Sequence, residues 1–391
     1  MNNAAKISIV IILCAAIIFG VFSLVKKNTR EKLISEANQV IAEYDSSARF
    51  SYDNLDINNI LSPTQLVFSD VRLKSENYTI AASEAVVDLS DEKITYENLE
   101  LDIINDAAKE ANLGYKIMFS ERVQIVQSPD KENSYNINLP DSFELDIAGE
   151  RSVANYLPGK KPITLTLDNN KDFQSFYYED QGVTMDSAVE GTGIKSESTK
   201  NIIDVKKTVN ADADSYEIIF ISNENTYGDR QAFNINVDTS FSKAKTDDRF
   251  ETYLDIRDFS VSFANYDIKF SGELFQNWQN FIPYGDLKFS FSNFKVALDE
   301  FFTEGFLEGL AADPQIAQLI TDTSTEDKQK FVKFLSVLNN SDSDDLLLNI
   351  TRNSAEMPTV NDYTVQQLEE FYNKIFLDSD TSSEEELPEL R

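Results

Sequence analysis

The chain carries many carboxylates but few of the other side chains that perform chemistry. Its 391 residues include 67 Asp and Glu, 35 Lys and Arg, a single cysteine and no histidine. Without histidine, the chain cannot use imidazole as a general acid or base, as the partner of a nucleophile or as a metal ligand. Because Cys14 is the only cysteine, neither an intramolecular disulfide nor a cysteine zinc site can form. These counts exclude most familiar enzyme designs.

The spacing of carboxylates is the remaining route to chemistry. Asn210, Asp212 and Asp214 stand at alternate positions, as at the start of a calcium-binding loop. Such a loop also needs glycine at its sixth position and a bidentate glutamate at its twelfth. Ser215 and Ile221 occupy those places, so we interpret this group as a solvated strand end.

No other group of residues selects a reaction. Asp342, Asp344 and Asp345 lie within four residues of the chain, and we interpret them as a charged surface loop. A glycosidase needs two carboxylates at a set separation across a cleft, and no pair is singled out here. The segment 191–196 (GTGIKS) lacks the spacing of a phosphate-binding loop. We therefore assign no catalytic residue, no cofactor site and no metal site.

The net charge of −32 bears on the choice of partner. Nucleic-acid binding needs a surface of Lys and Arg that displaces counterions, so we exclude a nucleic-acid partner. With 41% hydrophobic and 11% aromatic residues, the chain is too apolar to be disordered as a whole.

Aromatic residues are the most suggestive feature. There are 27 Phe and 16 Tyr, and Phe is dense between Phe259 and Phe306. These residues could form an ordinary core between a sheet and the C-terminal helices. They could instead form an apolar face that holds acyl chains or an amphipathic partner. The candidate residues for such a face are Phe259, Val261, Phe263, Phe270, Phe289, Phe291, Phe301 and Phe302.

The N-terminal segment predicts a membrane anchor. Residues 7–25, which include Ile7, Ile12, Phe19 and Val25, contain no charge over 19 positions. A helix of that length spans roughly 28 Å, close to the hydrocarbon thickness of a bilayer. A cleaved signal peptide would have a shorter apolar core and a small-residue cleavage site. A lipoprotein anchor at Cys14 would need a small residue before it, where Leu13 stands. An uncleaved, single-pass signal anchor fits best.

The flanking charges leave the membrane orientation open. More basic residues follow the anchor (Lys26, Lys27, Arg30 and Lys32) than precede it, which favours a cytoplasmic domain. Long domains, however, cross the membrane largely regardless of flanking charge.

Beyond the anchor, the spacing of the apolar residues changes along the chain. Apolar residues at helical spacing predict a juxtamembrane helix over 28–48. From about residue 50 to 298 the period is two, as in Leu99, Leu101 and Ile103, which predicts antiparallel strands with one apolar face. The stretch 182–214 is poorer in apolar residues and could be a long hairpin, a polar edge or a boundary.

Helical spacing returns after residue 298, with a strand predicted at 346–350 and a last helix opened by the capping box of Thr364 and Gln367. The expected fold class is β-rich α+β, with a transmembrane helix, a large antiparallel sheet and C-terminal helices packing on or beside it. The expected divisions are 1–27 (anchor), 28–48 (helix), 49–298 (β domain, with halves 49–180 and 215–298), 299–377 (helical region) and 378–391 (disordered acidic tail).

Two segments carry a resemblance to a known family. Residues 50–89 read FSYDNLDINN, then TQLVFSDVRLKS, then YTIAASEAVVDLS, and residues 284–298 read YGDLKFSFSNFKVAL, a strand that runs into a helix. With an N-terminal anchor and a short helix before a strand-rich domain, this layout resembles the AsmA-like group of Gram-negative envelope proteins and related proteobacterial membrane-anchored families of unknown function. The low glycine content and the short length depart from the large lipid-bridging members.

The resemblance implies a large periplasmic domain on an inner-membrane anchor and a role in envelope homeostasis through lipids. It carries over no catalytic residue. Our first hypothesis is a non-enzymatic, membrane-anchored envelope protein that binds lipid or another apolar ligand, with the C-terminal helices as a lid. The alternatives are a scaffold that binds a protein partner and a carboxylate-dependent hydrolase.

Overall fold

The computed structural model describes residues 30–58, 64–104, 114–129, 131, 133–147, 150–168, 172–187, 195–210, 213–227, 232–244, 251–277, 280–301, 325–339, 343–353 and 356–377. The predicted anchor residues Ile7, Ile12, Phe19 and Val25 and the predicted acidic tail lie outside these ranges. None of the helices within them is long and apolar enough to span a membrane. The chain divides into an N-terminal unit (1–207 with 222–228) and a C-terminal unit (208–221 with 229–391).

The N-terminal unit opens with helix α2 (Arg30–Tyr44), which packs on the short strand β1 (Arg49–Ser51). Ala37 and Ile41 of α2 are buried, because residues four apart lie on the same face of a helix. Asn38 stands between them. Its Oδ1 accepts a hydrogen bond from the backbone N–H of Phe50 at 2.6 Å, and its Nδ2 donates to the Phe50 carbonyl at 3.2 Å.

A forked sheet follows. Strand β3 (Gln65–Lys74) pairs with β1 and β2 (Asn54–Asn58) on one edge and with β4 (Tyr78–Asp88) on the other. The far edge of β4 is shared: its first residues pair with β6 (Leu99–Ile104), and its last residues pair with β5 (Lys93–Glu97). Asn98 separates β5 from β6 with a φ of 50°, and its Nδ2 donates to Ser83 Oγ on β4 at 2.9 Å. The sheet divides into two branches at this point.

Successive hairpins then join the two branches in turn. The first branch continues from β5 through β8 (Val123–Gln127), β9 (Ser134–Asn138), β12 (Ile163–Leu167) and β13 (Phe173–Asp180) to β16 (Lys200–Val209). The second continues from β6 through β7 (Gly114–Phe119), β10 (Ser142–Ile147), β11 (Glu150–Tyr156), β14 (Val183–Ser187) and β15 (Lys195–Ser198) to β17 (Ala213–Tyr227). The pattern repeats at intervals of about 40 residues, a length typical of repeat architectures.

The apolar sides of both branches contribute to one core. Leu66, Ile94, Ile137 and Leu165 are among its fully buried side chains, and Leu101 and Phe119 of the second branch belong to the same cluster. Alternate residues of each strand point inward, as the period of two requires.

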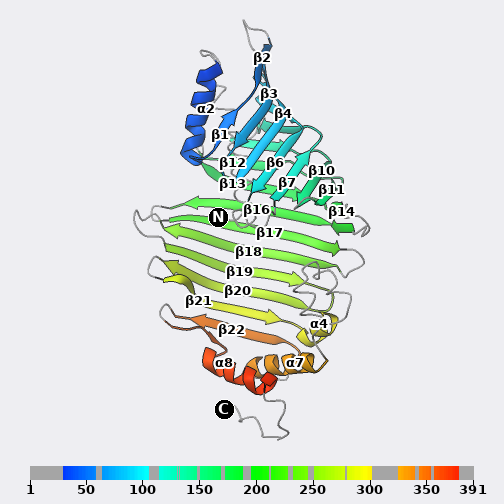
Figure 1. Ribbon diagram of the computed structural model, residues 1–391, viewed down its shortest axis with the longest axis vertical. Coiled ribbons are helices and arrows are strands. Elements are labelled where there is room, and N and C mark those ends of the chain that lie inside the picture. Colours follow the sequence, from blue (N-terminus) through cyan, green and yellow to red (C-terminus); the bar gives the residue numbers. More distant parts are fainter. Residues whose placement is uncertain are drawn as a thin grey trace. The chain divides into compact units, whose positions relative to one another are not determined.

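The C-terminal unit contains a meander of long strands. These are β18 (Phe233–Ala244), β19 (Glu251–Ser262), β20 (Asp267–Asn277), β21 (Asn280–Phe291) and β22 (Leu346–Arg352), which lie side by side in chain order (Figure 1). The short strands β23 (Thr359–Val360) and β24 (Tyr363–Thr364) follow β22.

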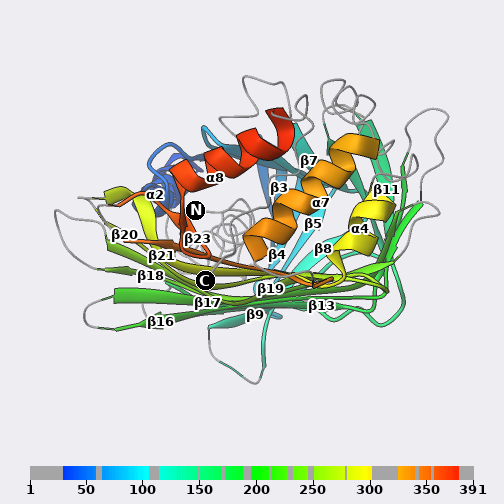
Figure 2. The same ribbon diagram turned by 90° about the horizontal axis from the view of Figure 1, so that it is seen from below.

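Helices α4 (Phe294–Phe301), α7 (Thr325–Asn339), α8 (Val365–Tyr372) and η1 (Asn373–Leu377) complete the unit. Within this unit α7 and α8 lie next to β22 in Figure 1, and Figure 2 shows them on one side of the long strands. Thr364 caps α8 and forms the predicted capping box with Gln367.

The strand-rich prediction is confirmed: the described residues form a large antiparallel sheet with a few short helices, and every pairing described above is antiparallel. The predicted strand at 346–350 is β22. In the apolar-poor stretch 182–214, the described residues form β14, β15, β16 and the start of β17.

Candidate functional site

Five of the candidate apolar residues lie on one face of the β18–β22 strands. Phe259 on β19 stands opposite Val237 on β18 and opposite Phe270 on β20, and Phe270 stands opposite Phe289 on β21. Directly opposed residues of antiparallel strands point to the same side of a sheet. These side chains therefore form one row that continues to Leu348 on β22. We call this face, with its two flanking rows, the aromatic face.

The flanking rows continue the apolar surface. One row contains Ile235, Val261, Ile268, Phe291 and Leu346, and the other contains Ile256, Gly272, Leu287 and Ile350. The rings are in contact: the centroids of Phe259 and Phe270 lie 5.9 Å apart, and those of Phe270 and Phe289 lie 4.8 Å apart. Phe263 contacts Phe233 at 5.6 Å and stacks on Tyr266 at 4.5 Å.

Burial changes along the aromatic face. At its β21–β22 side, Phe291 and Leu346 are buried together with Phe294 and Ala297 of α4. Val332 and Leu335 of α7 pack against the same cluster. The other partly buried residues that pack against it are Phe263, Ile268, Phe289 and Leu348. At the β19 side, by contrast, Phe259 is 39% exposed. The helices therefore cover one side of the face more fully than the other.

A glycine pair shapes the centre of this sheet. Gly272 and Gly285 have φ values of 138° and 141°, a region that is open essentially only to glycine. A Cβ on Gly272 would lie 2.1 Å from the Asp286 carbonyl oxygen, and one on Gly285 would lie 2.1 Å from that of Glu273. Both positions therefore require glycine if β20 and β21 are to keep this register.

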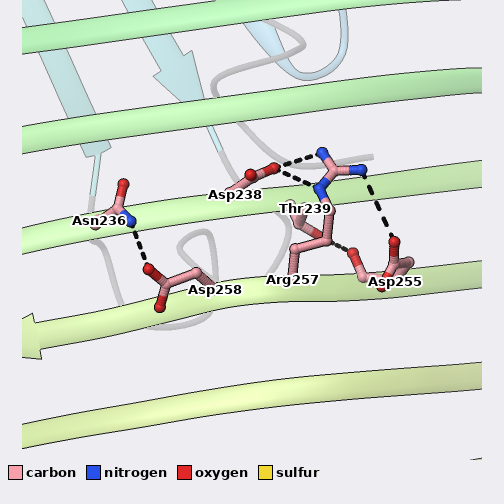
Figure 3. Close-up of polar contacts among 6 residues, drawn as sticks. All are labelled: Asn236, Asp238, Thr239, Asp255, Arg257 and Asp258. Carbon is pink, nitrogen blue, oxygen red and sulfur yellow. Dashed lines mark hydrogen bonds and ion pairs between the residues drawn. The ribbon is translucent and has the colours of Figure 1, made fainter.

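Behind Phe259 the opposite face of the same strands is polar, and a β-bulge on β19 interrupts it, whereas nearer the other end of the strands that face carries the contacting rings of Tyr253, Phe275 and Tyr284. Asp238 pairs with Asp258 and Thr239 pairs with Ile256, so Arg257 is an extra residue in β19. Figure 3 shows Arg257 between two carboxylates: its Nε donates to Asp238 at 2.7 Å, and a second guanidinium nitrogen lies 3.8 Å from Asp255. The hydrogen bond that Arg257 donates to Asp238 holds the pKa of Arg257 above its ordinary value.

Two further hydrogen bonds hold the same bulge. Asn236 Nδ2 donates to Asp258 at 2.6 Å, and the Thr239 hydroxyl donates to the Asp255 carbonyl at 2.8 Å (Figure 3). Bulges bend a strand and change where its side chains point. Phe259 follows this bulge directly, so these polar contacts help to position the partly exposed end of the aromatic face.

The structure describes six of the eight predicted apolar residues, and all six lie on or beside this face. Five of them, Phe259, Val261, Phe270, Phe289 and Phe291, occupy its rows. Phe263 lies one residue beyond β19. The side chain of Phe301 and the whole of Phe302 lie outside the described residues.

Two of the acidic residues considered in the sequence, Asp344 and Asp345, have local roles. Asp344 accepts a hydrogen bond from the Phe294 N–H through its carbonyl, and its carboxylate lies 3.0 Å from Lys295 Nζ. Asp345 Oδ1 accepts from the Asn293 N–H at 2.9 Å. Both residues hold the start of α4. Asp212 and Asp342 lie outside the described residues.

Sequence reasoning missed a buried polar network in the N-terminal unit. The Asp180 side chain is fully buried and accepts hydrogen bonds from the Tyr178 hydroxyl, from the Gly182 N–H at 2.7 Å and from Asn201 Nδ2 at 2.9 Å. Asn201 Oδ1 in turn accepts from the Ser222 hydroxyl. Burial raises the pKa of Tyr178 far above its ordinary value, so its phenol stays protonated and donates. With its hydrogen bonds made inside the protein, this network fits a structural role.

In comparisons with known proteins, no family model, no curated protein and no solved structure matches this chain.

Proposed function

We propose that the protein binds lipid or a similar apolar ligand on the aromatic face, as a non-enzymatic envelope protein of the AsmA-like kind. The observation that carries the proposal is the 39% exposure of Phe259 in a row of apolar side chains that crosses five strands. The C-terminal helices would serve as a lid over part of this face.

Exposed apolar surface is unfavourable in water. Burying apolar surface stabilises by about 25 cal/mol per Å², so a chain gains stability by covering such rows. Contiguous apolar surface that stays uncovered commonly marks an interaction site. An acyl chain has no polar groups to desolvate, so it can lie on aromatic rings without leaving a hydrogen bond unmade.

The proposed location follows from the predicted N-terminal anchor. We place the protein in the inner membrane with a single pass and with the large domain in the periplasm. The 19 uncharged residues at 7–25 and the resemblance described above support this placement. The flanking basic residues favour the opposite orientation, so a reporter fused to the C-terminus tests it directly.

Lipid extraction from the purified full chain tests the proposed function. We expect lipid to accompany the wild-type protein, and Phe259→Asp to lower the amount by severalfold, because a carboxylate on this row is costly beside an acyl chain. Val153→Asp is the matched control, since Val153 is 45% exposed on β11 of the N-terminal unit.

Mass spectrometry of the extracts, with lipid counted per protein, gives the readout. An equal loss of lipid in both variants would contradict the assignment to the aromatic face. Absence of lipid from the wild-type protein would contradict the proposed function itself.

A further inference from the structure

Asparagine side chains close two sheet edges in this protein. Asn38 bonds both backbone groups of Phe50 on β1. On β22, Asn361 Nδ2 donates to the Leu347 carbonyl at 2.9 Å, and its Oδ1 accepts from the Asn349 N–H at 2.7 Å. Asn339 Oδ1 accepts from the Leu347 N–H at 2.9 Å. A side-chain amide carries a donor and an acceptor, so it can occupy the place of a neighbouring strand.

Strand β2 differs from these two edges. It pairs with β3 along its whole length, from Asn54 opposite Ser69 to Asn58 opposite Gln65. In the part of the chain that the structure describes, no strand and no side chain bonds the other edge of β2. Alternate N–H and C=O groups of an edge strand point away from the sheet. They offer a template for one more strand.

The two faces of β2 define what such a strand must look like. Leu55 and Ile57 stand opposite Phe68 and Leu66, which are buried in the core of the N-terminal unit. Ile57 is nevertheless 40% exposed, because nothing described covers it on the edge side. Asp56, between them, faces the other way. An added strand would therefore place apolar residues beside Ile57 and polar residues beside Asp56.

Charge argues against a second copy of this chain as the added strand. An antiparallel copy that pairs Leu55 with Ile57 must pair Asp56 with Asp56, and like charges directly opposite each other are destabilising. The net charge of −32 on each copy adds repulsion at long range. A partner strand with Lys or Arg opposite Asp56 would instead be attracted to the Asp56 carboxylate.

We propose that the free edge of β2 binds an extended segment of a partner protein, in which apolar residues alternate with basic ones. The segment adds as a strand: its backbone supplies the hydrogen bonds, and its alternating side chains supply the specificity. Its apolar residues cover Ile57 and extend the core, and a basic residue pairs with Asp56. The proposal concerns the N-terminal unit and is independent of the ligand proposed for the aromatic face.

A model peptide tests this proposal. The probe is a fluorescent ten-residue peptide of alternating Val and Lys, titrated with the full chain in non-ionic detergent and followed by fluorescence anisotropy. A second peptide has the same sequence with N-methyl groups on alternate residues, so it keeps the charge and loses backbone donors. We expect the N-methylated peptide to bind about tenfold more weakly, because strand addition depends on main-chain hydrogen bonds.

Two variants locate the binding. Asp56→Lys should weaken binding of the Val-Lys peptide about tenfold and should improve binding of a Val-Glu peptide, since the charge opposite the added strand is reversed. Asp91→Lys is the matched control, since Asp91 lies on an exposed turn between β4 and β5. It should change either affinity less than about twofold, because exposed charges at a distance are screened.

Three results would overturn the proposal. The first is equal binding of the parent and N-methylated peptides, which would mean that charge alone attracts them. The second is an equal effect of Asp91→Lys and Asp56→Lys. The third is a concentration-dependent dimer that Ile57→Lys abolishes, since it would assign the edge of β2 to a second copy of this chain.

Discussion

The core of the N-terminal unit and the aromatic face of the C-terminal unit are built from the same kind of antiparallel strand, but they are covered differently. In the N-terminal unit the two branches of the forked sheet contribute to one cluster, in which Leu66 and Ile94 are fully buried. In the C-terminal unit the helices bury one side of the face, at Phe291 and Phe294, while Phe259 is 39% exposed.

The difference shows that apolar alternation and burial are separate properties. Strands of both units alternate apolar and polar residues, but burial depends on a second layer over the apolar side. The Asn98 fork gives the N-terminal unit its second layer from the sheet itself. Full burial of a Phe side chain is worth roughly 1.5–3 kcal/mol, so Phe259 realises only part of that stabilisation.

We expect the largest change in the free energy of unfolding when a core leucine of the N-terminal unit is replaced, and a smaller change for a leucine of the aromatic face. Leu66→Ala should lower the free energy of unfolding by about 3 kcal/mol, because the substitution leaves a cavity in a packed core. Leu287→Ala, at a partly buried position in a flanking row of the aromatic face, should cost only about 1 kcal/mol. Urea unfolding followed by circular dichroism measures both. Equal losses would contradict the distinction between a sealed core and a partly covered face.

A second prediction compares the polar contacts of the two units. Asp180→Ala should cost about 2–3 kcal/mol, because it leaves the buried partners of the carboxylate without an acceptor. Arg257→Ala should cost less than about 1 kcal/mol, since its ion pairs with Asp238 and Asp255 are partly exposed.

The same urea titrations report these two losses. If Arg257→Ala proved as costly as Asp180→Ala, the bulge on β19 would be a stronger structural element than its exposure indicates.

The smallest predicted change in stability is the loss, at acid pH, of the contribution of Asp88 at the end of β4. Hydrogen bonds from Ser90 and Gln65 lower the pKa of Asp88 from 3.8 to about 2. A lowered pKa means that Asp88 stabilises the fold above about pH 4 and loses this contribution as the pH falls towards 2. The difference in thermal midpoint between wild type and Asp88→Asn should therefore shrink over that interval.

Asp91→Asn is the control for this pH series, because it removes the same charge from the same turn. Asp91→Asn keeps the hydrogen bond to Asp88, because that bond is donated by the backbone N–H of residue 91. A difference for Asp88→Asn that stays constant from pH 5 to pH 2 would contradict the role given to its hydrogen bonds.

The strands with strict alternation could be predicted from the sequence, because their pattern is local. Ile94 and Tyr96 mark β5, Leu99 and Leu101 mark β6, and each pattern gives both the element and the inward-facing residues. The cap of α8 was predictable for the same reason, since Thr364 and Gln367 are three residues apart.

The fork and the polar core could not be predicted, because they depend on distant partners. The pairing of β5 with β8 and of β7 with β10 leaves no signal in either strand alone. Ser134 and Thr166 are both buried, and their hydroxyls lie 3.2 Å apart. Alternation with the core residues Tyr135 and Leu165 assigns both positions to the other face of the sheet, so a hydrophobic pattern predicts them at the surface. In the same way, the residue types on the aromatic face could be read from the sequence, whereas the 39% exposure of Phe259 depends on where the helices pack.

Photo-crosslinking with a diazirine fatty acid shows whether an acyl chain binds on the aromatic face. The full chain is irradiated with the probe, and the modified peptides are identified by mass spectrometry. We expect the labels to concentrate on the aromatic face, in peptides that contain Val237, Phe259 and Phe270, and an excess of unlabelled fatty acid to displace them. Labels that follow exposure alone, with the peptide containing Val153 modified as strongly as the one containing Phe259, would contradict it.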